Sequence, residues 1–312
     1  MNAVEDLWSK FERSESVNTS NINTSSNNNY TVVFIGDSGS GKSTLLQTFL
    51  KPSATSKDTK PTIALDYNYA RKTVNNSGSN NSSSKLVAHL WEVGGDLTEP
   101  RLLEVGLTKT SLSTAAFFLV CDLSRPQNVL NATMRMIQAT KEIISKRTAE
   151  LQATNVHVLN DLRDRISAGF KGHTDAARVK PLDVPIYLVA NKTDIARNMP
   201  LAERKVIFQI LRFLAHYYGA GLVSVSSNDS VSKDNFRALM SAVCFGAAVK
   251  NTKEANVEKP VYITRGQDAF SDIFLGGQVD EAMGSKYRVV SSEAELDALI
   301  SAKGVSRDGW KK

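Results

Sequence analysis

The feature that most constrains this chain is a glycine-rich loop at residues 36–43, GDSGSGKS, which fits the phosphate-binding pattern G-x-x-x-x-G-K-[ST]. An apolar run at 31–35 precedes it and is typical of a buried strand, and residues 44–50 have the apolar spacing of a packed helix. Glycines let several amide N–H groups point at one anion, and the helix start adds its own N–H groups and dipole. The loop therefore predicts a phosphate site, with an ordinary Gly/Ser-rich turn as the alternative.

The loop also assigns roles to individual residues. Lys42 is expected to reach the terminal phosphates of a nucleotide, and the Ser43 hydroxyl is expected to bind Mg²⁺. The residues that we expect to contact phosphates in and after the loop are Gly36, Ser38, Gly39, Ser40, Gly41, Lys42, Ser43 and Thr44.

Composition narrows the partners and the compartment. No apolar run approaches the ~20 residues that cross a bilayer, and the first residues lack the apolar core of a signal peptide, so we expect no membrane association. The net charge of +6 comes without a basic block interleaved with aromatics, so we expect no nucleic-acid partner. The two cysteines, Cys121 and Cys244, lie in apolar stretches typical of reduced core thiols, which predicts the cytosol.

The chain divides into three sections. Residues 1–29 combine an amphipathic helix (Leu7, Trp8 and Phe11 on one face) with a Ser/Asn/Thr-rich flexible tether, and this helix either folds back or docks elsewhere. Residues 30–250 alternate strands with helices, which predicts an α/β domain with a mostly parallel six-stranded sheet and helices on both faces. A hairpin of 62–69 with 86–91 makes one antiparallel edge strand. Residues 251–312 form a C-terminal extension with a last helix at 292–303.

The choice of base comes from residues 191–194, NKTD, directly after the predicted strand at 186–190. They resemble the N-K-x-D element of the Ras-like GTPase family, whose aspartate accepts two hydrogen bonds from guanine. The resemblance implies a Ras-like P-loop NTPase fold that binds GTP or GDP with Mg²⁺, and guanine contacts from Asn191, Lys192 and Asp194. Ser226 follows the strand at 222–225 in the place of the base-capping loop, whose lysine is missing here.

Further positions correspond to the switches of that family. Thr62 resembles the threonine that joins Ser43 as a Mg²⁺ ligand, and the Gly95 amide stands where the family contacts the γ-phosphate. Glu92 replaces the usual aspartate of D-x-x-G, and Asp96 replaces the glutamine that orients water, so we expect slow or absent hydrolysis. The four histidines are far apart in sequence, and no metal-ligand cluster or Ser-His-Asp set indicates another chemistry.

Longer stretches resemble the dynein light intermediate chains. They are residues 60–71 (KPTIALDYNYAR) and 91–95 (WEVGG), whose glutamate is the form that family carries. Residues 205–207 (KVI), 211–220 (LRFLAHYYGA) and 259–264 (KPVYIT) are similar to the version in cytoplasmic dynein 2, the retrograde motor of intraflagellar transport. The resemblance covers roughly residues 7–264, and the short tail after 264 favours the ciliary paralogue.

The resemblance implies a non-motor subunit of a dynein complex. Its partners would be the dynein heavy chain and other dynein subunits, with microtubules contacted only through the heavy chain. Its location would be the cytoplasm, the cytoskeleton, and the cilium or flagellum with its basal body. Two hypotheses stay open: a structural adaptor with a stably held nucleotide, and a regulatory GTPase that changes partners as it cycles. Glu92 and Asp96 favour the adaptor, which is at most a slow GTPase.

Overall fold

The computed structural model describes residues 29–51, 61–75, 83–95, 101–248 and 252–275. Three expectations lie outside these residues: the N-terminal amphipathic helix with its tether, Asp96 at the water-orienting position, and the helix at 292–303. None of the helices in the described ranges combines the length and apolarity that a membrane span requires.

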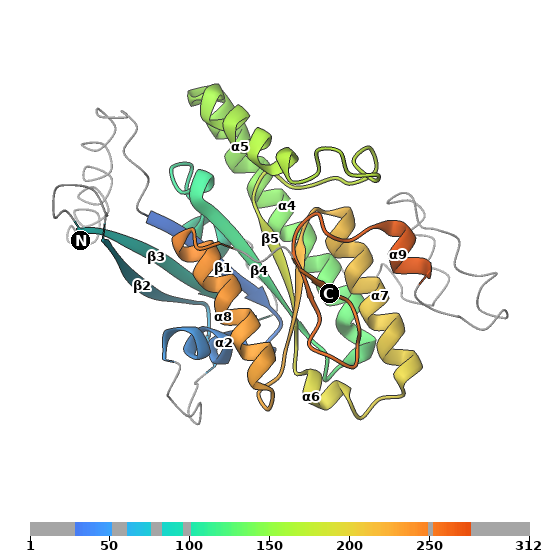
Figure 1. Ribbon diagram of the computed structural model, residues 1–312. Coiled ribbons are helices and arrows are strands. Elements are labelled where there is room, and N and C mark those ends of the chain that lie inside the picture. The colour runs from blue at the N-terminus through green and yellow to red at the C-terminus, as the bar shows by residue number, and fades with distance from the viewer. Residues whose placement is uncertain (1–28, 52–60, 76–82, 96–100, 249–251, 276–312) are drawn as a thin grey trace.

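The described residues form one sheet of eight strands in the order β2-β3-β1-β4-β5-β6-β8-β7 (Figure 1). Pairing is parallel from β3 through β1, β4 and β5 to β6, and β2 runs antiparallel to β3. The mostly parallel sheet and its antiparallel hairpin strand are therefore confirmed. The strands are β1 (Asn29–Gly36), β2 (Leu65–Asn75), β3 (Ser83–Val93), β4 (Ala115–Asp122), β5 (Ile186–Asn191), β6 (Gly221–Val225), β7 (Lys253–Glu254) and β8 (Tyr262–Ile263).

The six strands predicted for residues 30–250 correspond to β1 to β6, and two short strands after residue 250 extend the sheet beyond β6. β8 pairs antiparallel with β6, and β7 pairs antiparallel with β8, so antiparallel strands lie at both edges. Each has only two residues, which is too short to produce an alternating pattern in the sequence. Ser224 stabilises this edge twice: its main-chain N donates to Val261 O, and its Oγ accepts from Val261 N, both at 2.8 Å.

Helices cover both faces of the sheet, as predicted (Figure 1). One face packs on α2 and α8 through an aromatic cluster in which Phe118 stacks on Phe34 and meets Phe236 edge to face. The other face packs on α3, α4, α5 and α7, and α9 lies against α7. The helices are α2 (Lys42–Leu50), α3 (Leu102–Gly106), α4 (Val129–Thr154), α5 (Val156–Ala168), α6 (Thr193–Ala196), α7 (Leu201–Tyr217), α8 (Ser230–Phe245) and α9 (Phe270–Leu275), with 3-10 turns η3 (Leu112–Thr114) and η4 (Pro126–Asn128).

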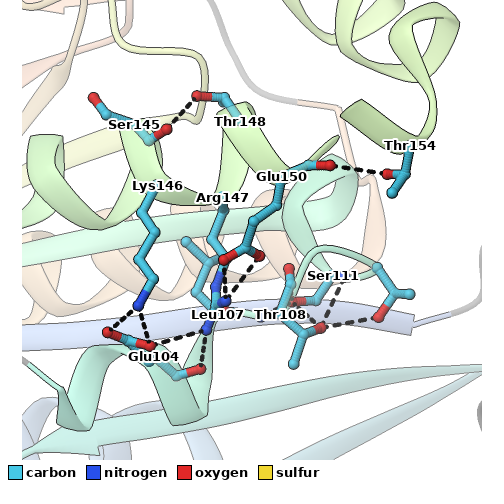
Figure 2. A network of polar contacts seen from close by, with 11 residues as sticks. Glu104, Leu107, Thr108, Ser111, Ser145, Lys146, Arg147, Thr148, Glu150 and Thr154 are labelled. Carbon is cyan, nitrogen blue, oxygen red and sulfur yellow. Dashed lines mark hydrogen bonds and ion pairs between the residues drawn. The ribbon is translucent and has the colours of Figure 1, made fainter. Parts of the chain in front are cut away.

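A polar network fastens the short helix α3 to the long helix α4 (Figure 2). Arg147 donates from Nε to Leu107 O at 2.7 Å and from Nη2 to Glu104 O at 3.1 Å. Lys146 pairs with the Glu104 carboxylate at 2.7 Å, and Glu150 holds the other side of the Arg147 guanidinium. Because α3 begins shortly after Gly95, this network anchors the chain that follows the predicted second switch.

Candidate nucleotide-binding site

The glycine-rich loop lies at the junction between β1 and α2. β1 ends at Gly36 and α2 begins at Lys42, and no side chain caps the start of this helix. Gly39 and Gly41 have φ angles of 73° and 95°, in the left-handed region that favours glycine. The uncapped amides at the start of α2 and the loop between the two glycines therefore form the kind of backbone cradle that binds anions.

Asn191, the last residue of β5, contacts the loop directly. Its Nδ2 donates to the main-chain oxygen of Ser40 at 2.8 Å, and the side chain is buried. A Cβ atom placed on Gly41 would overlap the Asn191 amide. Glycine at position 41 is thus required both by its backbone angle and by the close approach of the base-motif asparagine.

Lys42 is buried and lies along the loop. Its Nζ donates to the main-chain oxygens of Gly36 at 2.7 Å and Asp37 at 3.1 Å. These two bonds hold the ammonium group over the loop, close to where bound phosphates would lie. Thr44 sits half-buried in the first turn of α2.

The two residues predicted to bind Mg²⁺ meet at a single carboxylate. Ser43 Oγ donates to Oε1 of Glu92 at 2.7 Å, and Thr62 Oγ1 donates to the same oxygen at 2.8 Å. Glu92 lies near the end of β3 and is only 2% exposed. The strand predicted to start at Thr62 begins at Leu65 in the structure, so Thr62 lies just before β2, where its side chain contacts Glu92. Hydroxyl and carboxylate oxygens are the ligands that Mg²⁺ prefers, so these residues fit the ion.

Residues that follow β3 contact both the loop and the predicted first switch. Gly94 N donates to Ala64 O at 2.6 Å. A Cβ atom on Gly95 would overlap the backbone of Ser38. Gly95 is therefore placed directly beside the phosphate loop, in a position compatible with the γ-phosphate contact that the sequence predicts.

Lys192 combines an unusual backbone conformation with an ion pair. Its φ of 62° lies in the left-handed region, and its Nζ is 2.7 Å from Oδ2 of Asp122, the last residue of β4. Burial alone would raise the pKa of Asp122, but hydrogen bonds from Lys192 and Ser124 outweigh burial, and the pKa lies below its ordinary value. The lysine stem is thus fixed at the rim of the site while its charge is compensated.

Asp194 carries a buried carboxylate oxygen that has no hydrogen-bond partner in the described part of the chain. An unpaired buried acceptor is costly, so such an oxygen calls for a donor. The N1–H and 2-amino groups of guanine are donors of the right kind for this oxygen.

Ser226 lies in the turn between β6 and α8. Its Oγ accepts from Asn228 N at 3.1 Å, and its N–H donates to Ser232 Oγ at 3.1 Å. Thr193 Oγ1 donates to Val225 O at 3.2 Å and so joins this turn to the base motif. The structure therefore brings the loop, the two switch residues and the base motif to one edge of the sheet, the one at which the parallel strands have their carboxyl ends.

Two polar residues at this edge were missed from the sequence. Asp122 ends an apolar strand, and a charge at that position is a signal that could have found it. Arg135, in α4, forms an ion pair of 3.3 Å with Asp37 in the loop. No pattern in the sequence relates Arg135 to Asp37, because α4 and the end of β1 come together only in the folded domain.

The four histidines are far apart in sequence, but the fold brings two of them together. His173 and His216 lie beside Asp175, with ligand atoms within 4.8 Å of one another. Each of these atoms is already hydrogen bonded: His216 Nε2 to Asp175 at 2.9 Å, and the His173 ring nitrogens to Asp268 O and Asp175 N at 2.8 and 3.0 Å. Asp175 also accepts from Phe270 N at 2.8 Å. This cluster therefore fastens the chain before α9 to α7.

The sequence of the chain matches one family model and several named proteins. A family model described as Roc, the Ras of Complex domain of DAPkinase, matches residues 31–149. The chain is 32% identical over 243 residues to the proteins named cytoplasmic dynein 2 light intermediate chain 1 of Rattus norvegicus and Homo sapiens, which covers 78% of this chain and 67% of each relative. The Danio rerio protein of that name is 31% identical over 244 residues.

A solved structure supports the fold at lower sequence similarity. The crystal structure of the dynein light intermediate chain's conserved domain superposes with a TM-score of 0.56 and 13% identity. The match covers 88% of this chain and 97% of that chain. At this identity the likeness concerns the fold alone.

Proposed function

The chain belongs to the cytoplasmic dynein 2 light intermediate chain family, and on that premise we propose that it is a non-catalytic subunit of a dynein 2 motor complex. In this role it binds and stabilises the dynein heavy chain for retrograde intraflagellar transport and for assembly of the cilium or flagellum. It contacts microtubules only through the heavy chain, and it is found in the cytoplasm, at the basal body and in the cilium. The similarity across 78% of the chain carries this proposal.

The guanine-nucleotide pocket is proposed to have a structural role. GTP or GDP would lie with its phosphates on the loop from Gly36 to Thr44 and its base against Asp194, whose buried oxygen has no partner within the described residues. Mg²⁺ would be held by Ser43 and Thr62, where it would neutralise phosphate charge. The bond from Asn191 to Ser40 favours a stably held nucleotide because it ties the two halves of the pocket together.

Hydrolysis is proposed to be slow or absent. Asp96, outside the described residues, takes the position of the water-orienting glutamine, and a carboxylate there adds negative charge beside a phosphate. Loss of one such positioning group costs about 2–4 kcal/mol of barrier, which is about 10²–10³ in rate. Single-turnover cleavage of GTP at the rate of an activated GTPase would contradict this.

A regulatory GTPase is the second candidate, and one observation favours it. Gly95 lies against Ser38, and Gly94 is bonded to Ala64, so both switch segments contact the phosphate loop or each other. A third phosphate at the loop would therefore move segments that reach the surface. The two candidates differ in whether heavy-chain binding depends on the nucleotide.

Two measurements test the proposal. Affinity purification of the tagged chain from ciliated cells should recover the dynein 2 heavy chain in stoichiometric amount, and its absence would contradict a subunit role. Denaturation of the purified chain should release a guanine nucleotide that chromatography identifies as GDP or GTP. A chain that folds fully with no nucleotide would contradict the structural pocket but not the subunit role.

A further inference from the structure

Glu92 is a buried carboxylate for which the described residues show no ion pair. It is 2% exposed, and its only polar contacts recorded in the described part of the chain are the hydroxyls of Ser43 and Thr62. Both hydroxyls donate to the same oxygen, Oε1, and as neutral groups they do not compensate the charge of the carboxylate. Buried carboxylates are stable when they pair with a cation or bind a metal ion, so Glu92 lies where a cation is needed.

A second carboxylate increases this need. In the register of β2 and β3, Asp66 lies directly opposite Glu92. Like charges opposite one another in an antiparallel pair destabilise the sheet unless a positive charge lies between or beside them. Asp66 accepts a bond from the Asn68 amide, which carries no charge.

Both hydroxyl oxygens lie at a distance from the Glu92 oxygen that suits neighbouring ligands of one metal ion. Oε1 of Glu92 is 2.7 Å from Ser43 Oγ and 2.8 Å from Thr62 Oγ1. In an octahedral site with metal–oxygen distances of about 2.1 Å, neighbouring ligand oxygens lie about 3 Å apart. Both hydroxyls donate their protons to Glu92, so each oxygen keeps lone pairs with which it can bind a cation.

From this arrangement we infer that Glu92 is a direct ligand of the metal ion, together with Ser43 and Thr62. The inference rests on the proposed nucleotide site and extends it. An aspartate, the usual residue at this position in Ras-like GTPases, is one methylene shorter and would leave room for a water molecule between carboxylate and metal. Glutamate removes that water and adds a negatively charged protein ligand, so the ion is held without help from a γ-phosphate.

The test uses Mn²⁺, which takes the oxygen ligands of Mg²⁺ and is visible by electron paramagnetic resonance. The full chain is stripped of metal and titrated with Mn²⁺, both without nucleotide and with excess GDP. Line broadening in ¹⁷O-labelled water then counts the water molecules on the bound ion. We compare the unaltered chain with Glu92→Asp, and with Glu150→Asp as the matched control, because Glu150 is a surface glutamate paired with Arg147 in α4.

For Glu92→Asp we expect one additional bound water and Mn²⁺ affinity lower by at least about tenfold. Glu150→Asp should change neither value. Equal water counts in the unaltered chain and Glu92→Asp, or no Mn²⁺ bound by the unaltered chain in either arm, would overturn the inference. If Glu92→Asp fails to fold, Glu92→Gln replaces it, and there an unchanged Mn²⁺ affinity would be the contradicting result.

Failure of the proposed pocket is recognised separately. Binding of a fluorescent GDP analogue is measured on the same samples. A chain that binds no GDP but shows the water difference in the nucleotide-free arm would retain Glu92 as a metal ligand and contradict the nucleotide proposal. If the chain binds GDP but the water counts of the unaltered chain and Glu92→Asp are equal, the nucleotide proposal would be retained and Glu92 would not be a metal ligand.

Discussion

Asn191 and Ser40 are 151 residues apart in the chain and are joined by a buried hydrogen bond of 2.8 Å, from the side-chain Nδ2 to the main-chain oxygen. The bond connects the base-recognition turn after β5 with the phosphate loop after β1. It fixes the distance between the two parts of the pocket before any nucleotide binds.

Replacement of Asn191 by alanine should destabilise the chain and speed nucleotide release. The buried Ser40 oxygen would lose its donor, which costs about 1–3 kcal/mol of unfolding free energy. Urea denaturation and the dissociation rate of a fluorescent GDP analogue measure the two effects. Asn198→Ala is the control, since Asn198 is exposed. Equal unfolding free energies for the two variants would contradict the bracing role of Asn191.

Alanine at Gly41 should be more harmful than alanine at Gly39. Both glycines have positive φ, so both variants acquire backbone strain of about 1 kcal/mol or more. Only at Gly41 does the new Cβ also overlap the Asn191 amide, whereas nothing lies within 4 Å of it at Gly39. Thermal unfolding should therefore give a lower midpoint for Gly41→Ala. If Gly39→Ala has a midpoint as low as that of Gly41→Ala, backbone strain alone, and not the overlap with Asn191, would account for the destabilisation.

The ion pair of Arg135 with Asp37 should matter for binding more than for stability. The Arg135 side chain is 42% exposed, and exposed pairs contribute little to folding. Removing Arg135, however, leaves the Asp37 carboxylate uncompensated beside the phosphates. We expect Arg135→Ala to weaken GDP binding by up to about fivefold, and Asp37→Asn in the same chain to restore it.

Calorimetric titration with GDP measures this double-mutant cycle. Arg163→Ala is the control, because Arg163 forms a comparable exposed pair with Asp183 away from the loop. Weakening that Asp37→Asn does not reverse would mean that Arg135 acts other than by balancing the charge of Asp37.

The stability of the chain should fall as the pH decreases from 7 toward 5. Burial lowers the pKa of His216 below its ordinary value, and the Asp175 and Asp268 carboxylates that face it only partly offset burial. A histidine whose pKa is lower in the folded chain than in the unfolded chain stabilises the folded state at pH values above its unfolded pKa of about 6.5. That stabilisation is lost as the pH falls and the unfolded chain gains the proton more readily. The pKa values of the Asp175 and Asp268 carboxyls are also lowered. The stability that these two carboxylates contribute is therefore lost only at more acidic pH.

Urea denaturation at pH 7.5 and 5.5 tests this. His216→Gln should show a smaller difference between the two pH values than the unaltered chain. His157→Gln, at an exposed position, should keep the full difference. A difference that persists in His216→Gln would assign the pH dependence to another group.

The fold was largely predictable because its determinants are local. A continuous apolar run such as residues 31–35 indicates a buried strand, and the glycines of the loop indicate the turn that follows it. The strands β7 and β8 were not predictable, because two residues carry no period. The pairing of β8 with β6 depends on tertiary contacts such as Ser224 with Val261, and β7 in turn pairs with β8.

The sequence predicts which residues form the site better than it predicts the polar contacts between them. Glu92 was recognised as a departure from aspartate, but its shared contact with Ser43 and Thr62 arises only when β3, α2 and the segment before β2 meet. The same holds for Arg135 and for the His173–His216 pair, which no spacing in the sequence relates.

We propose that this Ras-like domain is a fixed part of a motor rather than a switch. The most direct measurement is capture of the dynein 2 heavy-chain tail by the full chain loaded in parallel with GDP and with a non-hydrolysable GTP analogue, the loading being verified by chromatography. We expect equal capture in both states. Capture in only one nucleotide state, or in neither, would contradict it.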